Sequence, residues 1–296
     1  MPRTLVRLCV TLGLVMVGLW LVGAPVTADP ADTVPPDPLS GTPVRDVYLR
    51  APQGGLQPGH PVQVLLALHG MGGNGQDFAQ DLTDQADRYG WLIVAPTIDY
   101  GDWTNPDVVA SEDPLLIQTL NDYLDGLPQV IGVPTRHLVL ILGHSRGAQL
   151  AHRFAEFRPD RVLAIAALSA GTYTMPESNA TFPYGIQDLE QYAGHPFDPA
   201  RFDTVGIWVG VGGQDTNAGD VPHQWDPVEG STRVQRAQAF EMAAQQLGAS
   251  AVLRVFGNAG HGLTGEMRAA ACDYLNRSQQ AQNARRDLFS VDVAPN

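Results

Sequence analysis

The stretch from Leu138 to Leu150 constrains the fold of this chain more than any other. Residues 138–142 are five consecutive apolar residues, which predict a buried strand. Residues 143–147 read Gly-His-Ser-Arg-Gly and fit the pattern G-x-S-x-G, and apolar residues then recur at helical spacing. In a strand–turn–helix of this kind the turn lifts the hydroxyl of Ser145 above the sheet, beside the positive end of a helix. The alternative is a Gly/Ser turn that only connects a strand to a helix.

Apolar runs and helical spacings alternate along the rest of the chain. This alternation predicts an α/β fold with a mostly parallel central sheet and helices on both of its faces. The first strand alternates in polarity and suits an edge, whereas the second is almost continuously apolar and suits the centre. The predicted strands are 44–49, 62–68, 91–95, 138–142, 162–168, 207–211 and 252–256, and the predicted helices include 76–89, 115–124 and 233–247.

The two ends of the chain differ from its middle. Residues 1–28 have two arginines, an apolar run and small residues before Asp29, as a secretory signal peptide does, so we expect a secreted protein. An uncleaved membrane anchor is the alternative. Residues 29–43 read as a flexible linker, 44–277 as one folded α/β domain and 278–296 as a polar tail that frays after the last helix.

Segment 170–204 is too long for an ordinary connection between a helix and a strand, and it is rich in aromatic residues. It is expected to form a lid-like insert or a pocket wall. The alternative is that its aromatic side chains pack into a small subsidiary core.

The charge and cysteine content exclude several classes of function. The net charge is −13, and all 18 basic residues are arginine, which argues against nucleic acid or an anionic membrane as a partner. Once the signal peptide is removed, Cys272 is the one cysteine left, so no internal disulfide is expected. The chain has neither paired cysteines nor an H-E-x-x-H motif, and we predict no metal and no cofactor. The oligomeric state is left open.

A serine needs a base, and that base needs an acid to orient it. Because functional groups collect at the carboxyl ends of parallel strands, the base and the acid are expected just after the later strands. Asp215 follows the strand 207–211, and His261 follows the strand 252–256. The order Ser, Asp, His is the one expected of a nucleophile on a strand–turn–helix of this kind. Without the other two residues, Asp215 would be interpreted as a turn residue and His261 as a cap of the following helix.

The turn after the second strand supplies backbone donors for an oxyanion. The N–H of Arg146, which follows the nucleophile, is one predicted donor, and the N–H of Met71 is the other, with Gly72 as its alternative. His69 is expected to brace this turn. Residues 70–75 also fit G-x-G-x-x-G, but a dinucleotide site is disfavoured because a strand precedes this one and the Ser, Asp and His would have no role.

With these motifs in place, the chain resembles α/β-hydrolase-fold serine esterases. Among them it is similar to exported poly(3-hydroxybutyrate) depolymerase-like and feruloyl-esterase-like proteins, over about 44–275. The resemblance implies that Ser145 is the nucleophile, Asp215 the acid and His261 the base, and that a small or polymeric ester is the substrate. The chain lacks the disulfide framework and the appended binding module of many such esterases.

Three aromatic residues are predicted to line a pocket for apolar or aryl groups: Tyr100, Trp103 and Tyr173. Two other functions remain open at this stage. A serine peptidase of the prolyl-oligopeptidase type would use the same three catalytic residues on an amide, and a non-catalytic binding protein would use the fold alone.

Overall fold

The computed structural model describes residues 37–177 and 179–291, which belong to one compact unit. The predicted signal peptide and the start of the linker therefore lie outside the described residues. None of the helices within the described ranges combines the length and the apolar character that a transmembrane helix needs.

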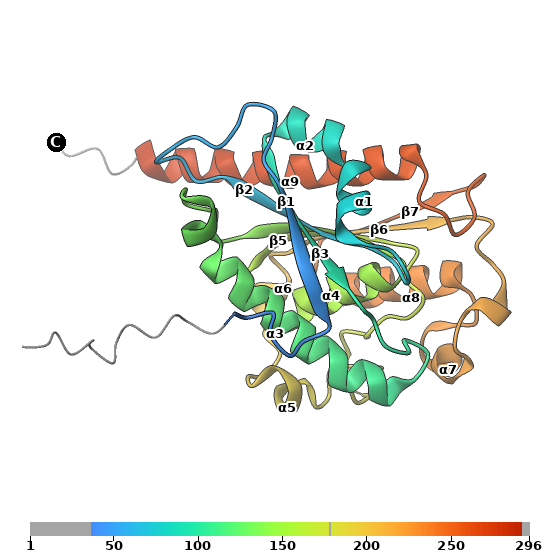
Figure 1. Cartoon of the computed structure of the whole chain (residues 1–296). Helices are drawn as coiled ribbons and strands as arrows, with labels where there is room; N and C mark the ends of the chain where they lie inside the picture. The colour runs from blue at the N-terminus through green and yellow to red at the C-terminus, as the bar shows by residue number, and fades with distance from the viewer. Residues whose placement is uncertain (1–36, 178, 292–296) are drawn as a thin grey trace, which may run out of the picture. The chain divides into compact units, whose positions relative to one another are not determined.

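The described strands form one seven-stranded sheet in the order β1-β3-β2-β4-β5-β6-β7 (Figure 1). β1 pairs antiparallel with β3, and every other neighbouring pair is parallel, so the predicted mostly parallel α/β sheet is confirmed. The edge position predicted for the first strand and the central position predicted for the second are also confirmed. The strands are β1 (Val44–Arg50), β2 (Gln63–Leu68), β3 (Trp91–Ile98), β4 (Val139–His144), β5 (Val162–Leu168), β6 (Gly206–Gly212) and β7 (Ala251–Phe256).

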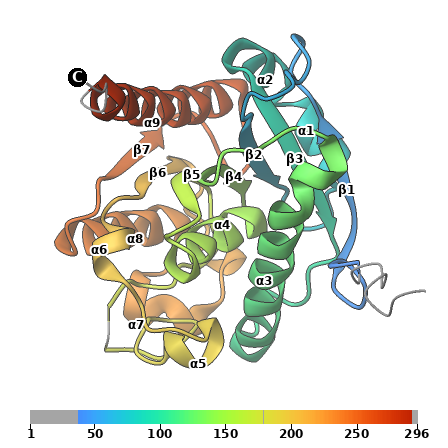
Figure 2. The same cartoon turned by 90° about the vertical axis from the view of Figure 1, so that its left-hand side faces the viewer.

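Helices cover both faces of the sheet. In Figure 2 the sheet lies between α9 and α2 on one side and α3, α4 and α8 on the other. The helices are α1 (Gly75–Gln80), α2 (Thr83–Tyr89), α3 (Pro106–Ile131), α4 (Arg146–Phe157), α5 (Leu189–Ala193), α6 (Pro199–Phe202), α7 (Asp226–Glu229), α8 (Arg233–Gln246) and α9 (Gly265–Val291), with 3-10 turns η1 (Ala218–Asp220) and η2 (His223–Trp225).

Strand β2 shows how the sequence builds two cores. Its side chains alternate between the faces of the sheet. Leu66 and Leu68 pack in the core that includes residues of α3, α4 and α8. Leu65 and Ala67 pack in the second core, with residues of α1, α2 and α9. Burial on both sides explains why this strand is apolar at almost every position.

Two helices differ in extent from their predicted ranges. α3 begins at Pro106, before the predicted start at residue 115, because the Asn105 side chain accepts from the N–H of Asp107 at 3.0 Å and caps the helix. The helix continues past Pro114, since its apolar face is buried against the sheet. The predicted helix 76–89 is divided into α1 and α2 at Leu82, where the backbone leaves helical angles (φ −106°, ψ 1°).

The polar segment after Ser278 is helical and forms most of the second half of α9, which reaches Val291. This corrects the expectation that the chain frays there. The polar side chains find partners on the body of the protein: the indole of Trp91 donates to Gln279 Oε1 at 2.5 Å, and Arg136 donates to Asn283 Oδ1 at 2.6 Å.

The aromatic side chains of the insert pack mainly on one another and on the body. Phe182 contacts the rings of Phe157 and Tyr192, with centroids 5.3 and 4.9 Å apart, and the rings of Phe197 and Phe202 lie 5.3 Å apart. Tyr173, Phe182 and Phe202 belong to the core that includes residues of α3, α4 and α8, so the aromatic side chains extend that core and do not form a subsidiary one.

Candidate active site

Ser145 lies at a sharp turn between β4 and α4. Its backbone has φ 55° and ψ −117°, which is unusual for a residue with a side chain. A Cβ on Gly147 would lie 2.1 Å from the carbonyl oxygen of Leu68, and a Cβ on Gly143 would lie 2.2 Å from the carbonyl oxygen of Gly147. Gly143 is therefore required for α4 to leave β4 at this angle, and Gly147 for α4 to pass close to the end of β2.

The structure brings Ser145, His261 and Asp215 together in one chain of hydrogen bonds. The Ser145 Oγ and His261 Nε2 atoms are 3.0 Å apart, and the His261 Nδ1 and Asp215 Oδ2 atoms are 2.8 Å apart. The His261 side chain is 39% exposed and the Asp215 side chain 3%, so the hydrogen-bonded series runs from a buried carboxylate through a partly exposed imidazole to the half-buried Ser145. A hydroxyl, an imidazole and a carboxylate in this order are the groups that activate a serine nucleophile.

The loops that carry the acid and the histidine touch through their backbones. A Cβ on Gly212, at the end of β6, would lie 2.1 Å from the carbonyl oxygen of Gly260. The Asp215 carboxylate also receives a hydrogen bond from Arg233 Nη1 at 3.1 Å. Burial acts to raise the pKa of Asp215, but the hydrogen bond from His261 and the charge of Arg233 outweigh it and hold that pKa below its ordinary value.

The turn after β2 lies directly beside the serine. Gly73 N donates to the Gly70 carbonyl at 3.1 Å, which leaves Met71 and Gly72 at the centre of the turn. A Cβ on Gly70 would come within 3.2 Å of the Ser145 Cβ. His69 braces the turn as expected: its Nδ1 lies 2.7 Å from the Gly70 carbonyl, and its Nε2 accepts from the N–H of Ile98 at 2.9 Å.

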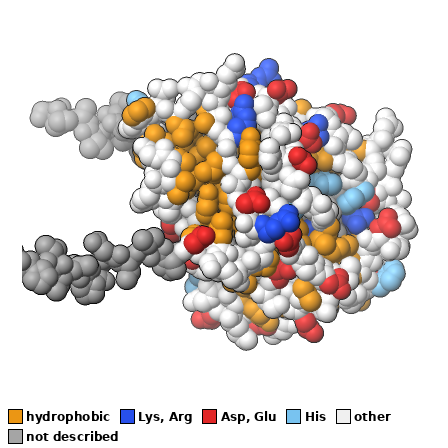
Figure 3. Space-filling model, viewed as in Figure 1, with side chains coloured by type: hydrophobic (Ala, Val, Ile, Leu, Met, Phe, Trp, Pro, Cys, Tyr) orange, Lys and Arg blue, Asp and Glu red, His pale blue; other side chains and the backbone are white. Residues whose placement is uncertain are grey.

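A cavity of about 500 Å³ opens at Ser145. Its wall includes two carboxylates and no arginine or lysine. Figure 3 shows histidine side chains at the surface on the side toward which β6 and β7 run. Within the described residues no group of three or more His, Cys, Asp or Glu could hold a metal ion. The lining residues are His69, Gly70, Met71, Gly72, Gly73, Asn74, Asp77, Phe78, Asp81, His144, Ser145 and His261.

The three aromatic residues predicted to bind substrate do not line this cavity. Tyr173 is fully buried and stacks on Phe240 with centroids 4.6 Å apart, so it is part of the core. Tyr100 lies beneath the turn, with its ring 5.3 Å from that of His69 and its hydroxyl buried. Trp103 packs against the backbone at Gly171, at the start of the insert. None of the described residues of 170–204 lines the cavity either.

The neighbours of Ser145 in the motif have structural contacts. The Arg146 side chain is 1% exposed and pairs with Glu112 at 2.9 Å and with Asp113, which anchors α4 to α3. His144 Nε2 lies 2.9 Å from the carbonyl oxygen of His261, and burial lowers the pKa of His144 to about 4, so its ring is neutral at pH 7.

Sequence reasoning did not find Arg233 or the cavity residues Asp77, Phe78 and Asp81. The three cavity residues belong to α1 and the segment after it, and they show only ordinary helical spacing in the sequence. Arg233 is the first residue of α8 and is far in sequence from the groups it contacts. No sequence signal marks these residues.

Comparison with known proteins identifies structures with a similar fold. No protein-family model and no curated protein sequence matches the chain. Among solved structures it is similar to poly(aspartic acid) hydrolase-1 from Sphingomonas sp. KT-1, with a TM-score of 0.60 and 23% identity over 77% of this chain and 91% of that one. It is also similar to the Bacillus cereus carboxylesterase (TM-score 0.53, 15% identity, 81% of this chain and 97% of that one). A ferulic acid esterase gives a TM-score of 0.51 and 17% identity over 79% of this chain and 98% of that one.

These likenesses, together with the sheet order, confirm the predicted resemblance to α/β-hydrolase esterases at the level of fold. The chain has the α/β-hydrolase fold.

Proposed function

We propose that this protein is a serine hydrolase that cleaves carboxylic esters through Ser145, His261 and Asp215. The observation that carries the proposal is the hydrogen-bonded chain from Asp215 through His261 to Ser145 at the wall of an open cavity. The similarity in fold to carboxylesterases supports the same reaction class.

In the proposed mechanism, His261 takes the proton of Ser145 as the hydroxyl oxygen attacks the ester carbonyl. Asp215 accepts the Nδ1–H hydrogen bond, keeps the imidazole in the required tautomer and stabilises its positive charge. Collapse of the tetrahedral intermediate releases the alcohol, which receives its proton from His261. Water then attacks the acyl-enzyme with the same histidine as base, and this step regenerates the serine.

The N–H groups of Met71 and Arg146 are the proposed donors to the oxyanion. Arg146 is the first residue of α4, where the helix provides no acceptor for its N–H. Met71 lies at the centre of the turn beside Ser145, and its N–H is not used by the hydrogen bond that closes the turn. The positive end of α4 adds to the stabilisation of the negative charge.

Cleavage of an amide is the second candidate function, because the name of the similar Sphingomonas protein is that of a hydrolase of poly(aspartic acid), which is a polyamide. The same three residues would serve a peptidase. The described wall of the cavity argues against a polyanionic substrate here. Asp77 would repel carboxylates, Asp81 is already paired with Arg268 at 3.3 Å, and no arginine or lysine lines the cavity. We therefore propose a neutral ester as the substrate.

The proposed cellular site is outside the cell, after removal of residues 1–28. This rests on the composition of the N-terminal segment alone. An uncleaved anchor would keep the same domain at a membrane surface.

The test is to treat residues 29–296 with a fluorophosphonate probe, locate the adduct by peptide mass and follow hydrolysis of p-nitrophenyl butyrate. We expect the adduct on Ser145, and Ser145→Ala should lower kcat by about 10⁴-fold or more with the fold retained. Ser111→Ala, at an exposed position on α3, is the matched control and should behave as wild type. A Ser145→Ala variant that keeps most of its activity would exclude the proposal. A panel of peptides compared with short esters separates amide from ester hydrolysis.

A further inference from the structure

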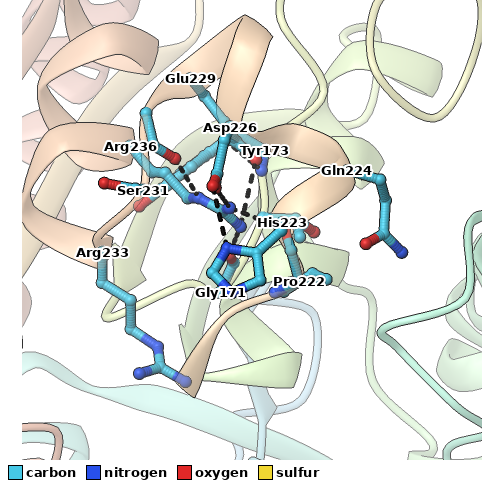
Figure 4. A network of polar contacts seen from close by, with 12 residues as sticks. Gly171, Tyr173, Pro222, His223, Gln224, Asp226, Glu229, Ser231, Arg233 and Arg236 are labelled. Atoms are coloured by element: carbon cyan, nitrogen blue, oxygen red, sulfur yellow. Dashed lines mark hydrogen bonds and ion pairs between the residues drawn. The ribbon is translucent and has the colours of Figure 1, made fainter. Parts of the chain in front are cut away.

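We propose that Arg233 is a positioning residue that fixes the Asp215 carboxylate and, through its charge, influences the pH dependence of the Asp215–His261 pair. This inference rests on the proposed function. Figure 4 shows Arg233 and Arg236 leaving the same helix: Arg236 enters a group of contacts with Asp226 and Gly171, whereas Arg233 points away from that group.

The two oxygens of Asp215 are held from two directions. Arg233 Nη1 donates to Oδ1 at 3.1 Å, and His261 Nδ1 lies 2.8 Å from Oδ2. A rotation of the carboxylate would break both contacts, so the guanidinium fixes the orientation that His261 requires. Arg233 Nη2 donates to the carbonyl oxygen of Asp220 at 2.8 Å, which ties the loop after Asp215 to the same side chain.

The contact between Arg233 and Asp215 is buried, which strengthens the electrostatic interaction between the two charges. The side chains of Arg233 and Asp215 are 7% and 3% exposed. At such a depth the positive charge favours the ionised carboxylate, and it also opposes a second positive charge on the neighbouring imidazole. The charge of Arg233 thus acts on the Asp215–His261 pair as a unit, and its removal should change the pH dependence of catalysis.

Two other titratable groups, His144 and Tyr173, interact with the Asp215–His261 pair, and Glu229 contacts the backbone of Tyr173. His144, at the end of β4, has its ring centroid 5.3 Å from that of His261, and its low pKa of about 4 keeps it neutral. Tyr173 lies behind Asp215, and burial raises its pKa, so it is neutral as well. Glu229 accepts a hydrogen bond from the N–H of Tyr173 at 2.8 Å, and burial raises the pKa of Glu229 to about 8. Arg233 is the positive charge in contact with the pair.

The experiment compares Arg233→Met and Arg233→Lys with wild type, using p-nitrophenyl butyrate and fluorophosphonate titration to count active sites. In Arg233→Met we expect kcat per active site to fall roughly 10²-fold with KM within about twofold, because an interaction with the catalytic pair is lost while the cavity is unchanged. The pH at which kcat/KM reaches half its maximum on the acid side should shift by about one pH unit. Arg233→Lys should keep the wild-type midpoint, because it keeps the charge, and should recover part of kcat.

Arg236→Lys is the matched control, since Arg236 is buried one turn further along α8 and holds the carbonyl oxygens of Gly171, Pro222 and Gly230. Arg236→Lys should lower the melting temperature without changing the pH at which kcat/KM reaches half its maximum. In an Asp215→Asn background, Arg233→Met should have little further effect on kcat, because both act through the same carboxylate.

Wild-type kcat and midpoint in Arg233→Met would overturn the inference. If that variant does not fold, Arg233→Gln takes its place, and wild-type kcat and midpoint in Arg233→Gln overturn the inference equally. If the fluorophosphonate does not label Ser145 in the wild-type protein, the proposed function itself is refuted, so the two failures are distinguishable.

Discussion

Replacement of Gly147 by alanine tests the geometry of the turn that presents Ser145. The new Cβ would lie 2.1 Å from the carbonyl oxygen of Leu68 and 2.6 Å from that of His69, where ordinary contacts begin near 3.4 Å. Both neighbours are backbone atoms at the end of a central strand, so they cannot turn aside as a flexible side chain would. The start of α4 must therefore move away from β2 by about 1 Å.

This displacement affects both stability and catalysis. Overpacking of a buried position costs about 1–3 kcal/mol of the free energy of unfolding, and each kcal/mol lowers Tm by about 2–4 °C in a domain of this size. Moving Ser145 by about 1 Å relative to His261 should reduce kcat by about 10²-fold, because attack needs closely aligned atoms. We expect KM to change less than kcat.

The assay combines thermal unfolding with the rate of p-nitrophenyl butyrate hydrolysis per titrated active site. Gly126→Ala is the control, since Gly126 lies within α3 and a Cβ there would meet nothing within 4 Å. Alanine should raise helix stability at that position by about 0.5–1 kcal/mol and leave kcat unchanged. A Gly147→Ala variant with the Tm and kcat of wild type would refute the argument that the close approach requires glycine.

Three further predictions follow from the site. Asp215→Asn should reduce kcat by about 10⁴-fold through the wrong imidazole tautomer, and near-wild-type turnover would exclude Asp215 as the acid. The pKa of His144 is about 4 in the folded protein, below its unfolded value of about 6.5. The stability that neutral His144 contributes above pH 6.5 should therefore be lost as the pH falls toward 4. Urea unfolding should show a smaller loss of the free energy of unfolding over this pH range in His144→Gln than in wild type. Asp77→Asn with Asp81→Asn should lower KM about 2–5-fold for a succinate half-ester and leave p-nitrophenyl butyrate unchanged; equal effects on both esters would contradict the electrostatic reasoning.

Much of the fold could be predicted because its determinants are local. A run such as 162–168 is apolar throughout since both faces of β5 are buried, and this is visible in sequence. The ends of α3 and α9 could not be predicted in this way. α3 continues through Pro114 because of its contacts with the sheet, and α9 continues past Ser278 because Trp91 and Arg136 bind its polar side chains. These contacts join residues far apart in the sequence.

The candidate nucleophile, acid and histidine could be identified from the amino-acid sequence alone. Each follows a strand with its own apolar pattern, and parallel strands end at the same edge of a sheet, so strand order in the chain was enough to propose Ser145, Asp215 and His261. The turn could be predicted as well. A side chain at Gly143 or Gly147 would clash with neighbouring backbone atoms, and the motif G-x-S-x-G has glycine at both positions.

The side chains that surround those three residues could not be identified without the folded structure. Tyr173 and Asp77 could each have faced the cavity or packed elsewhere, and the folded chain buries the first and exposes the second at the cavity wall. Arg233 contacts Asp215 because α8 begins beside the loop after β6, and no spacing in the sequence encodes that approach. Side-chain contacts between separate elements depend on how helices pack on the sheet, which is a property of the whole fold.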